Sequence, residues 1–229
     1  MTPYLLSILQ GAALTVAVSL LALLVALALG LLGALAKLSR HTGARLLATA
    51  YTTLIRGVPE LVLMLLVFYG GTIGLNRLLE ALGSESSVDI NPFLAGVLTI
   101  GFIYGAYMTE TLRGAILAIP AGQLEAARAF GMRPGQAFWR IVAPQMLRHA
   151  LPGFTNNWLV LIKATALVSL IGLQDMTYLA KQASAATRSP FVFFLFTGAL
   201  FLLYTSISLR VLGALQRRYS PQIQRRPGQ

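Results

Sequence analysis

The chain has 229 residues, of which 56% are hydrophobic and only 11% charged, and its formal net charge is +11. Soluble domains are about a quarter charged, so this composition excludes a water-soluble chain and indicates one that is solvated by lipid. The basic excess does not indicate a nucleic-acid binder, because such proteins gather basic residues on a soluble fold, whereas here they occur in bursts between apolar runs. We therefore expect a membrane protein without a nucleic-acid partner.

The residue types needed for metal binding or covalent chemistry are scarce. Cysteine is absent and there are two histidines, His41 and His149, so we expect no disulfide, no metal site and no catalytic residues. The first charged residue, Lys37, follows the initial apolar run instead of preceding it. A secretory signal peptide has the opposite order, so we interpret this run as a retained membrane helix.

Five apolar regions are long enough to cross a membrane, which takes about 20 residues per helix. The second region joins residues 61–75 to residues 46–55 across a break at Gly57, Val58 and Pro59. The predicted fold is an all-α membrane protein with one transmembrane domain over residues 1–229. Its five helices are expected at about residues 8–36, 48–77, 92–116, 151–173 and 190–212.

The basic residues that follow each span predict the orientation. The loops after the first, third and fifth spans are rich in arginine and lysine, whereas those after the second and fourth are poor in them. Because cytoplasmic loops carry the basic excess, we expect an external amino terminus and a cytoplasmic carboxyl terminus. The external loop after the second span contains Arg77, Glu80, Glu85 and Asp89, and the basic carboxyl-terminal segment contains Arg210, Arg217, Arg218, Arg225 and Arg226.

The loop after the third span, residues 120–145, has a recognisable local pattern. Good helix formers occupy residues 124–130, and Gly131 follows where a helix ends best in a left-handed residue. A turn at 133–135 precedes a second short helix at 136–143, which Pro144 is expected to end. A helix-turn-helix for DNA and an interfacial amphipathic hairpin have similar patterns. The position of the loop between two membrane spans argues against the DNA-binding helix-turn-helix. The pattern alone leaves the interfacial hairpin open.

The same loop resembles the EAA loop of the permease subunits of ABC importers. The residues that carry the resemblance are Glu125, Ala126, Ala127, Gly131, Ile141 and Pro144. Further segments resemble the polar amino acid permeases over nearly the whole chain: 51–60 (YTTLIRGVPE), 68–70 (FYG), 105–114 (GAYMTETLRG), 151–158 (LPGFTNNW) and 163–170 (KATALVSL). The resemblance is strongest to the histidine/lysine/arginine/ornithine and octopine/nopaline permeases.

This resemblance implies a type I importer permease of five helices in the bacterial inner membrane, with its amino terminus periplasmic. It implies a homologous or identical second permease, a dimer of ATP-binding-cassette ATPases on the two loops, and a periplasmic amino-acid-binding protein. Because the chain has no phosphate-binding G-x-x-x-x-G-K-[ST] loop, ATP and Mg²⁺ are expected on the partner ATPase, and this chain is not expected to be an enzyme. Residues 124–131 would dock the ATPase, and residues 136–144 would transmit its motion to the fourth span.

Polar groups inside the spans are candidates for the substrate path, because burying them in lipid is costly. Glu110 suits the cation of a basic amino acid, although it can instead pair with Arg113. Lys163 can meet a substrate carboxylate or pair structurally with Asp175. Glu60 follows the break at Pro59. The remaining candidates, which are equally suited to interhelical hydrogen bonds, are Asn157, Thr165 and Ser169.

The predicted function is therefore the translocation of a polar, basic amino acid by the permease subunit of an ATP-driven importer. An ion-coupled secondary transporter is an alternative, but such proteins usually have more spans or an inverted repeat. A structural membrane anchor is a second alternative, against which the charges inside the spans argue.

Overall fold

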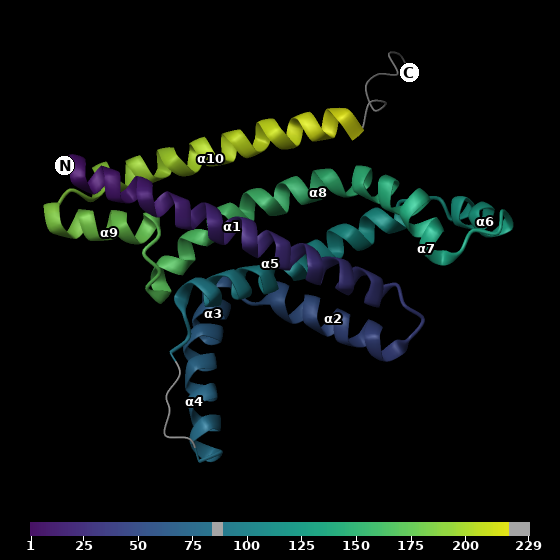
Figure 1. Ribbon diagram of the computed structural model, residues 1–229, viewed down its shortest axis with the longest axis horizontal. Coiled ribbons are helices and arrows are strands. Elements are labelled where there is room, and N and C mark those ends of the chain that lie inside the picture. Colours follow the sequence, from purple (N-terminus) through teal and green to yellow (C-terminus); the bar gives the residue numbers. More distant parts are fainter. Residues whose placement is uncertain (84–88, 220–229) are drawn as a thin grey trace.

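The computed structural model describes residues 1–83 and 89–219; Glu85 and the basic tail with Arg225 and Arg226 lie outside the described residues. The described residues form an elongated bundle of helices (Figure 1), which confirms the all-α prediction. In chain order the segments are α1 (Thr2–Lys37), α2 (Thr42–Gly57), α3 (Glu60–Leu65), the π-helix η1 (Leu66–Gly70), α4 (Gly71–Ala81), α5 (Pro92–Leu117), α6 (Ala121–Ala129), α7 (Pro134–Ala137), the π-helix η2 (Phe138–Val142), α8 (Ala143–Ala164), the 3₁₀-helix η3 (Thr165–Ile171), α9 (Met176–Thr187) and α10 (Pro190–Tyr219).

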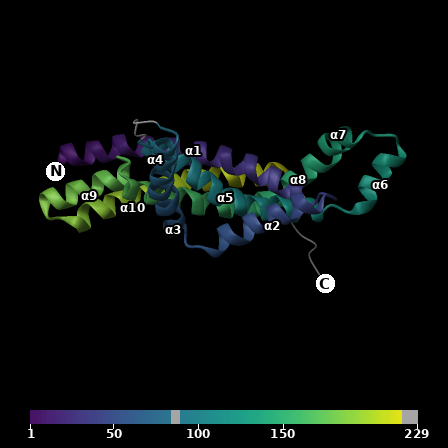
Figure 2. The ribbon, with the colours of Figure 1, turned by 90° about the horizontal axis from the view of Figure 1, so that it is seen from below.

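The bundle has two distinct ends. The amino terminus and α9 lie at one end, called here the amino-terminal end, and α6 and α7 lie at the other, called the hairpin end (Figure 1). The connection between α1 and α2 and the carboxyl end of α10 lie toward the hairpin end. The view from below shows α6 and α7 extending beyond the neighbouring helices (Figure 2). The segments that carry most of the basic residues therefore share one end of the molecule.

Five helices in the described part of the chain are long and apolar enough to cross a membrane: Thr2–Leu38, Glu60–Ala81, Pro92–Leu117, Pro134–Ile171 and Pro190–Tyr219. Four of them follow the long axis of the bundle. The helix Glu60–Ala81 instead runs across that axis (Figure 1), and α2 returns from the hairpin end and packs alongside α1 and α5.

The expected break at Gly57, Val58 and Pro59 is present, and it divides the region predicted over residues 48–77 into α2 and the helix Glu60–Ala81. The helix is interrupted between α2 and α3, where Val58 has extended backbone angles (φ −111°, ψ 139°). A residue that precedes proline is driven out of the helical region by contact with the proline ring. Pro59 is also extended in ψ (136°) and starts a helix in a new direction.

The fourth span also differs from its predicted bounds. The helix begins at Pro134 and continues to Ile171, so residues 136–143 are its first turns and not a separate short helix. Pro144 does not end it, contrary to the prediction. Proline removes one backbone hydrogen-bond donor, and the wider turn of η2, directly before it, is the kind of local adjustment that absorbs such a defect within a helix.

The core of the bundle is built on the packing of α1 against α5. Small residues allow the two backbones to approach closely, as is typical of membrane helices. A Cβ atom added at Gly30 of α1 would lie 2.5 Å from the Cβ of Met108 on α5. The surrounding core is formed by buried side chains from α1, α5 and α8, which include Val18, Ala22, Ala26, Ile100, Tyr104, Met108, Trp158 and Leu161.

A smaller cluster joins α9 to the first turns of α1 and α10 at the amino-terminal end, through Ile8, Met176, Ala180, Ala183 and Phe193. Asp175 caps α9: its Oδ1 accepts a hydrogen bond from the backbone N–H of Tyr178 at 2.9 Å. The residue is completely buried, and this burial raises the pKa of the Asp175 carboxyl to about 6.

Candidate functional site

The turn that joins α6 to α7 is fixed by Gly131. The helix ends at Phe130, and Gly131 has φ +72°, as its position in the sequence predicted. Its N–H donates to the carbonyl of Arg128 at 2.9 Å, and the N–H of Met132 donates to the carbonyl of Ala127 at 3.0 Å. This pair of bonds is a Schellman motif, which needs a left-handed residue at the glycine position.

Side-chain hydrogen bonds fix α6 to the start of the fourth span. The amide of Gln145 donates to the side-chain oxygen of Gln123 on α6 and to the backbone carbonyl of Ile141 at 3.0 Å. The N–H of Arg133 donates to Gln136 Oε1 at 3.1 Å and so closes the first turn of α7. The hairpin, meaning here residues 120–145, is thus held as one unit with the helix that follows it.

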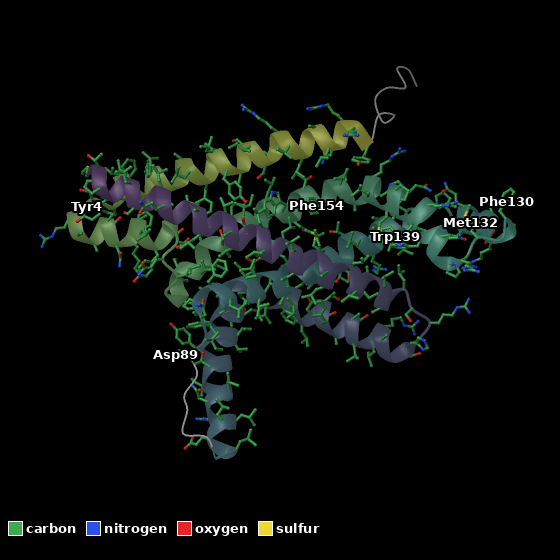
Figure 3. The ribbon with its side chains drawn as sticks, viewed as in Figure 1. Tyr4, Asp89, Phe130, Met132, Trp139 and Phe154 are labelled. Atoms are coloured by element: carbon green, nitrogen blue, oxygen red, sulfur yellow. The ribbon has the colours of Figure 1, made fainter. Side chains whose placement is uncertain are left out.

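A groove of about 440 Å³ lies between the two arms of the hairpin. Four of the six residues that carry the resemblance to the EAA loop line it, and Gly131 makes the turn next to it. Phe130 lies at the tip of the hairpin with 85% of its surface exposed (Figure 3), and Glu125 is exposed on α6. The lining residues are Gln123, Ala126, Ala127, Phe130, Met132, Arg140, Ile141, Pro144 and Gln145.

A cluster of charges links α1 to α5 where the two helices approach the hairpin end. Glu110 Oε1 accepts a hydrogen bond from the ammonium of Lys37, and Glu110 Oε2 accepts one from Arg113 Nε at 3.1 Å. The side chain of Lys37 is 11% exposed and that of Glu110 is 23% exposed. The expected partner Arg113 is therefore present, and Lys37, which lies 73 positions away in the chain, is an additional one.

A polar cavity of about 470 Å³ opens beside this cluster. It combines one carboxylate, two cations, two hydroxyl groups and one phenol, which is an arrangement that can hold a zwitterion with a charged side chain. The lining residues are Lys37, Thr52, Thr53, Arg56, Gly57, Tyr107 and Glu110.

Glu60 is connected to this cavity through two tyrosines. Its carboxylate accepts a hydrogen bond from the hydroxyl of Tyr104 at 2.9 Å. The Tyr104 ring lies 5.6 Å from the ring of Tyr107, and the guanidinium of Arg56 lies 5.3 Å from the centre of the Tyr107 ring. This distance is within the range of a cation–π interaction. Neither tyrosine was among the candidate site residues predicted from the sequence, so this connection was missed.

The polar residues of the fourth span do not line the cavity. Asn157 donates to Thr111 Oγ1 at 2.9 Å and so joins α8 to α5. Thr165 and Ser169 donate to backbone carbonyls within their own helix, those of Ile162 and Ala166. Lys163 is exposed. The alternative pairing of Lys163 with Asp175 is wrong, because both ion pairs in the described residues belong to Glu110.

Several cavity residues were missed because their chemistry comes from tertiary contacts. Lys37 was used only to predict the topology, and Thr52, Thr53 and Arg56 were considered as part of the segment 51–60 that carries the resemblance, not as site residues. The position of Arg56 directly before the Gly57-Val58-Pro59 break was the available signal, since a helix break exposes backbone groups to a cavity. Within the described part of the chain, no group of three or more His, Asp or Glu residues is placed to hold a metal ion.

Comparisons with known proteins identify the family of this chain. Residues 26–221 match the family described as "Binding-protein-dependent transport system inner membrane component". The chain is 51% identical over 218 residues to the histidine/lysine/arginine/ornithine transport system permease protein HisQ of Salmonella typhimurium, which covers 95% of both chains. It is 40% identical over 217 residues to the octopine transport system permease protein OccQ of Rhizobium radiobacter, which covers 95% of this chain and 92% of OccQ.

A solved structure, described as the crystal structure of an amino acid ABC transporter with histidines, has the same fold. It superposes with a TM-score of 0.80 at 31% identity and covers 95% of this chain and 96% of its own. These findings favour the importer permease over the secondary transporter and the structural anchor. The chain belongs to the family of inner membrane components of binding-protein-dependent transport systems.

Proposed function

We propose that this chain is the permease subunit of an ATP-binding-cassette importer that carries a basic amino acid, such as arginine, histidine, lysine or ornithine, or an opine. The printed names of HisQ and OccQ support the substrate class. The observation that carries the proposal is the hairpin groove, because Ala126, Ala127, Ile141 and Pro144 converge on it beside an exposed aromatic tip.

The hairpin is the part of this chain to which a separate ATPase subunit would bind. Its tip extends beyond the bundle (Figure 2), and its second arm is continuous with α8. A force applied to α6 would therefore reach the fourth span through the Gln123–Gln145 hydrogen bond and through the α7–α8 helix. ATP and Mg²⁺ would bind to the ATPase subunits and not to this chain.

The polar cavity beside Glu110 is the proposed part of the substrate path. The Glu110 carboxylate would receive the ammonium or guanidinium of the substrate side chain, and Arg56 would receive its carboxylate. Because Glu110 holds Lys37 and Arg113 in this structure, the substrate would have to replace one of these cations. Glu60 would act through Tyr104, and Asn157 would hold α8 against α5. Lys163, Thr165 and Ser169 lie apart from this cavity.

The proposed assembly contains two permeases, identical or homologous, two ATPases and a periplasmic binding protein. The hairpin end would face the cytoplasm and the amino terminus the periplasm. This orientation is supported by the basic residues at the hairpin end, which include Lys37, Arg45, Arg128, Arg133, Arg140 and Arg148. Closure of the ATPases on ATP would move the two hairpins and open the path outward, and hydrolysis would reset it.

The test is a substitution in the hairpin of the assembled transporter. Gly131→Val should lower substrate-stimulated ATP hydrolysis and uptake together, because a β-branched residue is strained at φ +72°. Normal ATPase assembly combined with normal substrate-stimulated hydrolysis in this variant would remove the coupling role from the hairpin.

A further inference from the structure

A second cavity, of about 400 Å³, lies between the hairpin and the ends of α1 and α5. It uses the other face of α6: Leu124 and Arg128 line it, whereas the groove described above is lined by Gln123, Ala126, Ala127 and Phe130. The two cavities share Met132 and are otherwise lined by different residues of the hairpin. The full lining of the second one is Leu35, Leu38, Ile116, Leu124, Arg128, Met132, Pro134, Ala137, Phe138 and Val142.

The chemistry of this cavity is apolar with a single cation. Arg128 is its only charged lining residue, and its side chain is exposed. Both ion pairs in the described part of the chain belong to Glu110, so the Arg128 guanidinium has no carboxylate partner there. An apolar pocket with one unpaired guanidinium fits a ligand that has a hydrocarbon part and an anionic group.

The position of the cavity identifies the source of such a ligand. Its walls include the last turns of α1 and α5, two of the helices long and apolar enough to cross the membrane. Trp139, 74% exposed, lies beside the lining residue Phe138, with their ring centres 5.3 Å apart (Figure 3). Exposed tryptophan is typical of the level of the lipid headgroups. In a membrane, lipid chains around α1 and α5 would be the nearest source of such a hydrocarbon part.

We propose that this cavity binds one acyl chain of an anionic phospholipid, with the lipid phosphate at Arg128. Pockets that combine basic residues with membrane helices at the cytoplasmic face are suited to anionic headgroups. The ATPase is a less suitable occupant, because the walls of this cavity include the ends of the membrane helices α1 and α5, which do not line the hairpin groove. A bound lipid would support the hairpin against the bundle from the membrane side.

The test uses the full-length chain in nanodiscs of phosphatidylcholine, with or without about a tenth of phosphatidylglycerol. The probe is phosphatidylglycerol with a photoactivatable acyl chain, and the labelled residues are mapped by mass spectrometry. Phosphatidylcholine with the same acyl chain is the matched probe. The variants are Arg128→Gln, Ala137→Trp, which fills the cavity, and the control Arg140→Gln, which removes a cation that lines the hairpin groove and not this cavity.

The proposal expects labelling of cavity residues such as Ile116 and Phe138 by the phosphatidylglycerol probe. Arg128→Gln should weaken this labelling about fivefold, because this is the change in affinity that follows from the loss of roughly one basic contact with an anionic lipid. Ala137→Trp should abolish it and Arg140→Gln should leave it unchanged. Equal labelling by both probes, equal loss in Arg128→Gln and Arg140→Gln, or displacement of the lipid by the ATPase subunit would each overturn the proposal. These readouts do not depend on transport, so they stand apart from the test of the proposed function.

Discussion

Lys37 near the end of α1 and Glu110 on α5 form an ion pair that ties the two most closely packed helices of the bundle together. Glu110 also binds Arg113, so one carboxylate is shared by two cations in a partly buried site. Loss of one partner from such a site leaves a charge without compensation, which is more costly than replacing both partners with neutral groups.

Glu110→Gln should therefore destabilise the protein by about 3 kcal/mol, and it should also reduce uptake of arginine. The double variant Lys37→Met/Glu110→Gln should recover most of the stability, because it also removes the partly buried cation Lys37 and leaves only Arg113, whose side chain is 38% exposed, while uptake stays low. Thermal unfolding in detergent and uptake in proteoliposomes measure the two effects separately. Unchanged arginine uptake in either variant would remove Glu110 from the substrate path.

Gly131→Val should cost about 1 to 2 kcal/mol, because an L-residue with a β carbon is strained in the left-handed conformation that Gly131 adopts at φ +72°. The matched control is Gly122→Ala, which lies within α6, where a Cβ atom would meet nothing within 4 Å. The control should be neutral or slightly stabilising. Unfolding of the two variants measures the difference in stability, and substrate-stimulated ATP hydrolysis and uptake should both fall in Gly131→Val and stay normal in Gly122→Ala. Equal behaviour of the two variants would contradict this prediction.

Glu125→Lys should weaken assembly with the ATPase without changing the fold, because Glu125 is exposed on α6 and has no ion pair within the described residues. Glu80→Lys makes the same charge change on the exposed surface of α4, away from the hairpin. Co-purification of the ATPase should fall only in the first variant. A similar loss in both would mean that net charge, and not the hairpin, controls assembly.

Asp175 should make the amino-terminal end of the bundle more stable at lower pH. Burial raises the pKa of the Asp175 carboxyl to about 6, whereas an aspartate carboxyl in an unfolded chain has a pKa of about 3.9. The folded protein therefore binds the proton more tightly, and stability should rise as the pH falls from 7.5 through 6 toward 4.

Asp175→Asn should remove this contribution, because asparagine also caps a helix and carries no charge. The variant should be more stable than the parent chain at pH 7.5 and should gain less on acidification. The melting temperatures of both proteins at pH 7.5 and pH 5 measure the effect. An identical pH response of the two proteins would show that Asp175 is not its source.

Most of the fold was predictable because the apolar runs are long and the breaks between them have local causes. The end of α6 was predicted from local sequence alone, because Gly131 follows a run of good helix formers. Pro59 likewise indicated a break, but not the transverse direction that the helix Glu60–Ala81 takes after it. The prediction that Pro144 ends a helix was wrong, because the π-helical turn in the preceding residues allows the helix to continue through Pro144.

The candidate site was less predictable, because its partners are distant in the chain. Glu110 and Glu60 were recognised as costly charges inside spans, yet Lys37 and Tyr104 became their partners only through the packing of α1, α3 and α5. Asn157, Thr165 and Ser169 share a polar character in the sequence. Only the structure separates the interhelical hydrogen bond of Asn157 from the local bonds of the two hydroxyl groups.

The most direct test of the account is uptake of labelled arginine by proteoliposomes that contain this chain with its second permease, ATPase and binding protein. The account predicts uptake that requires ATP, that lysine or histidine but not glutamate inhibits, and that Glu125→Lys in the hairpin abolishes. Uptake that persists without ATP and follows an imposed ion gradient, or that Glu125→Lys leaves unchanged, would contradict it.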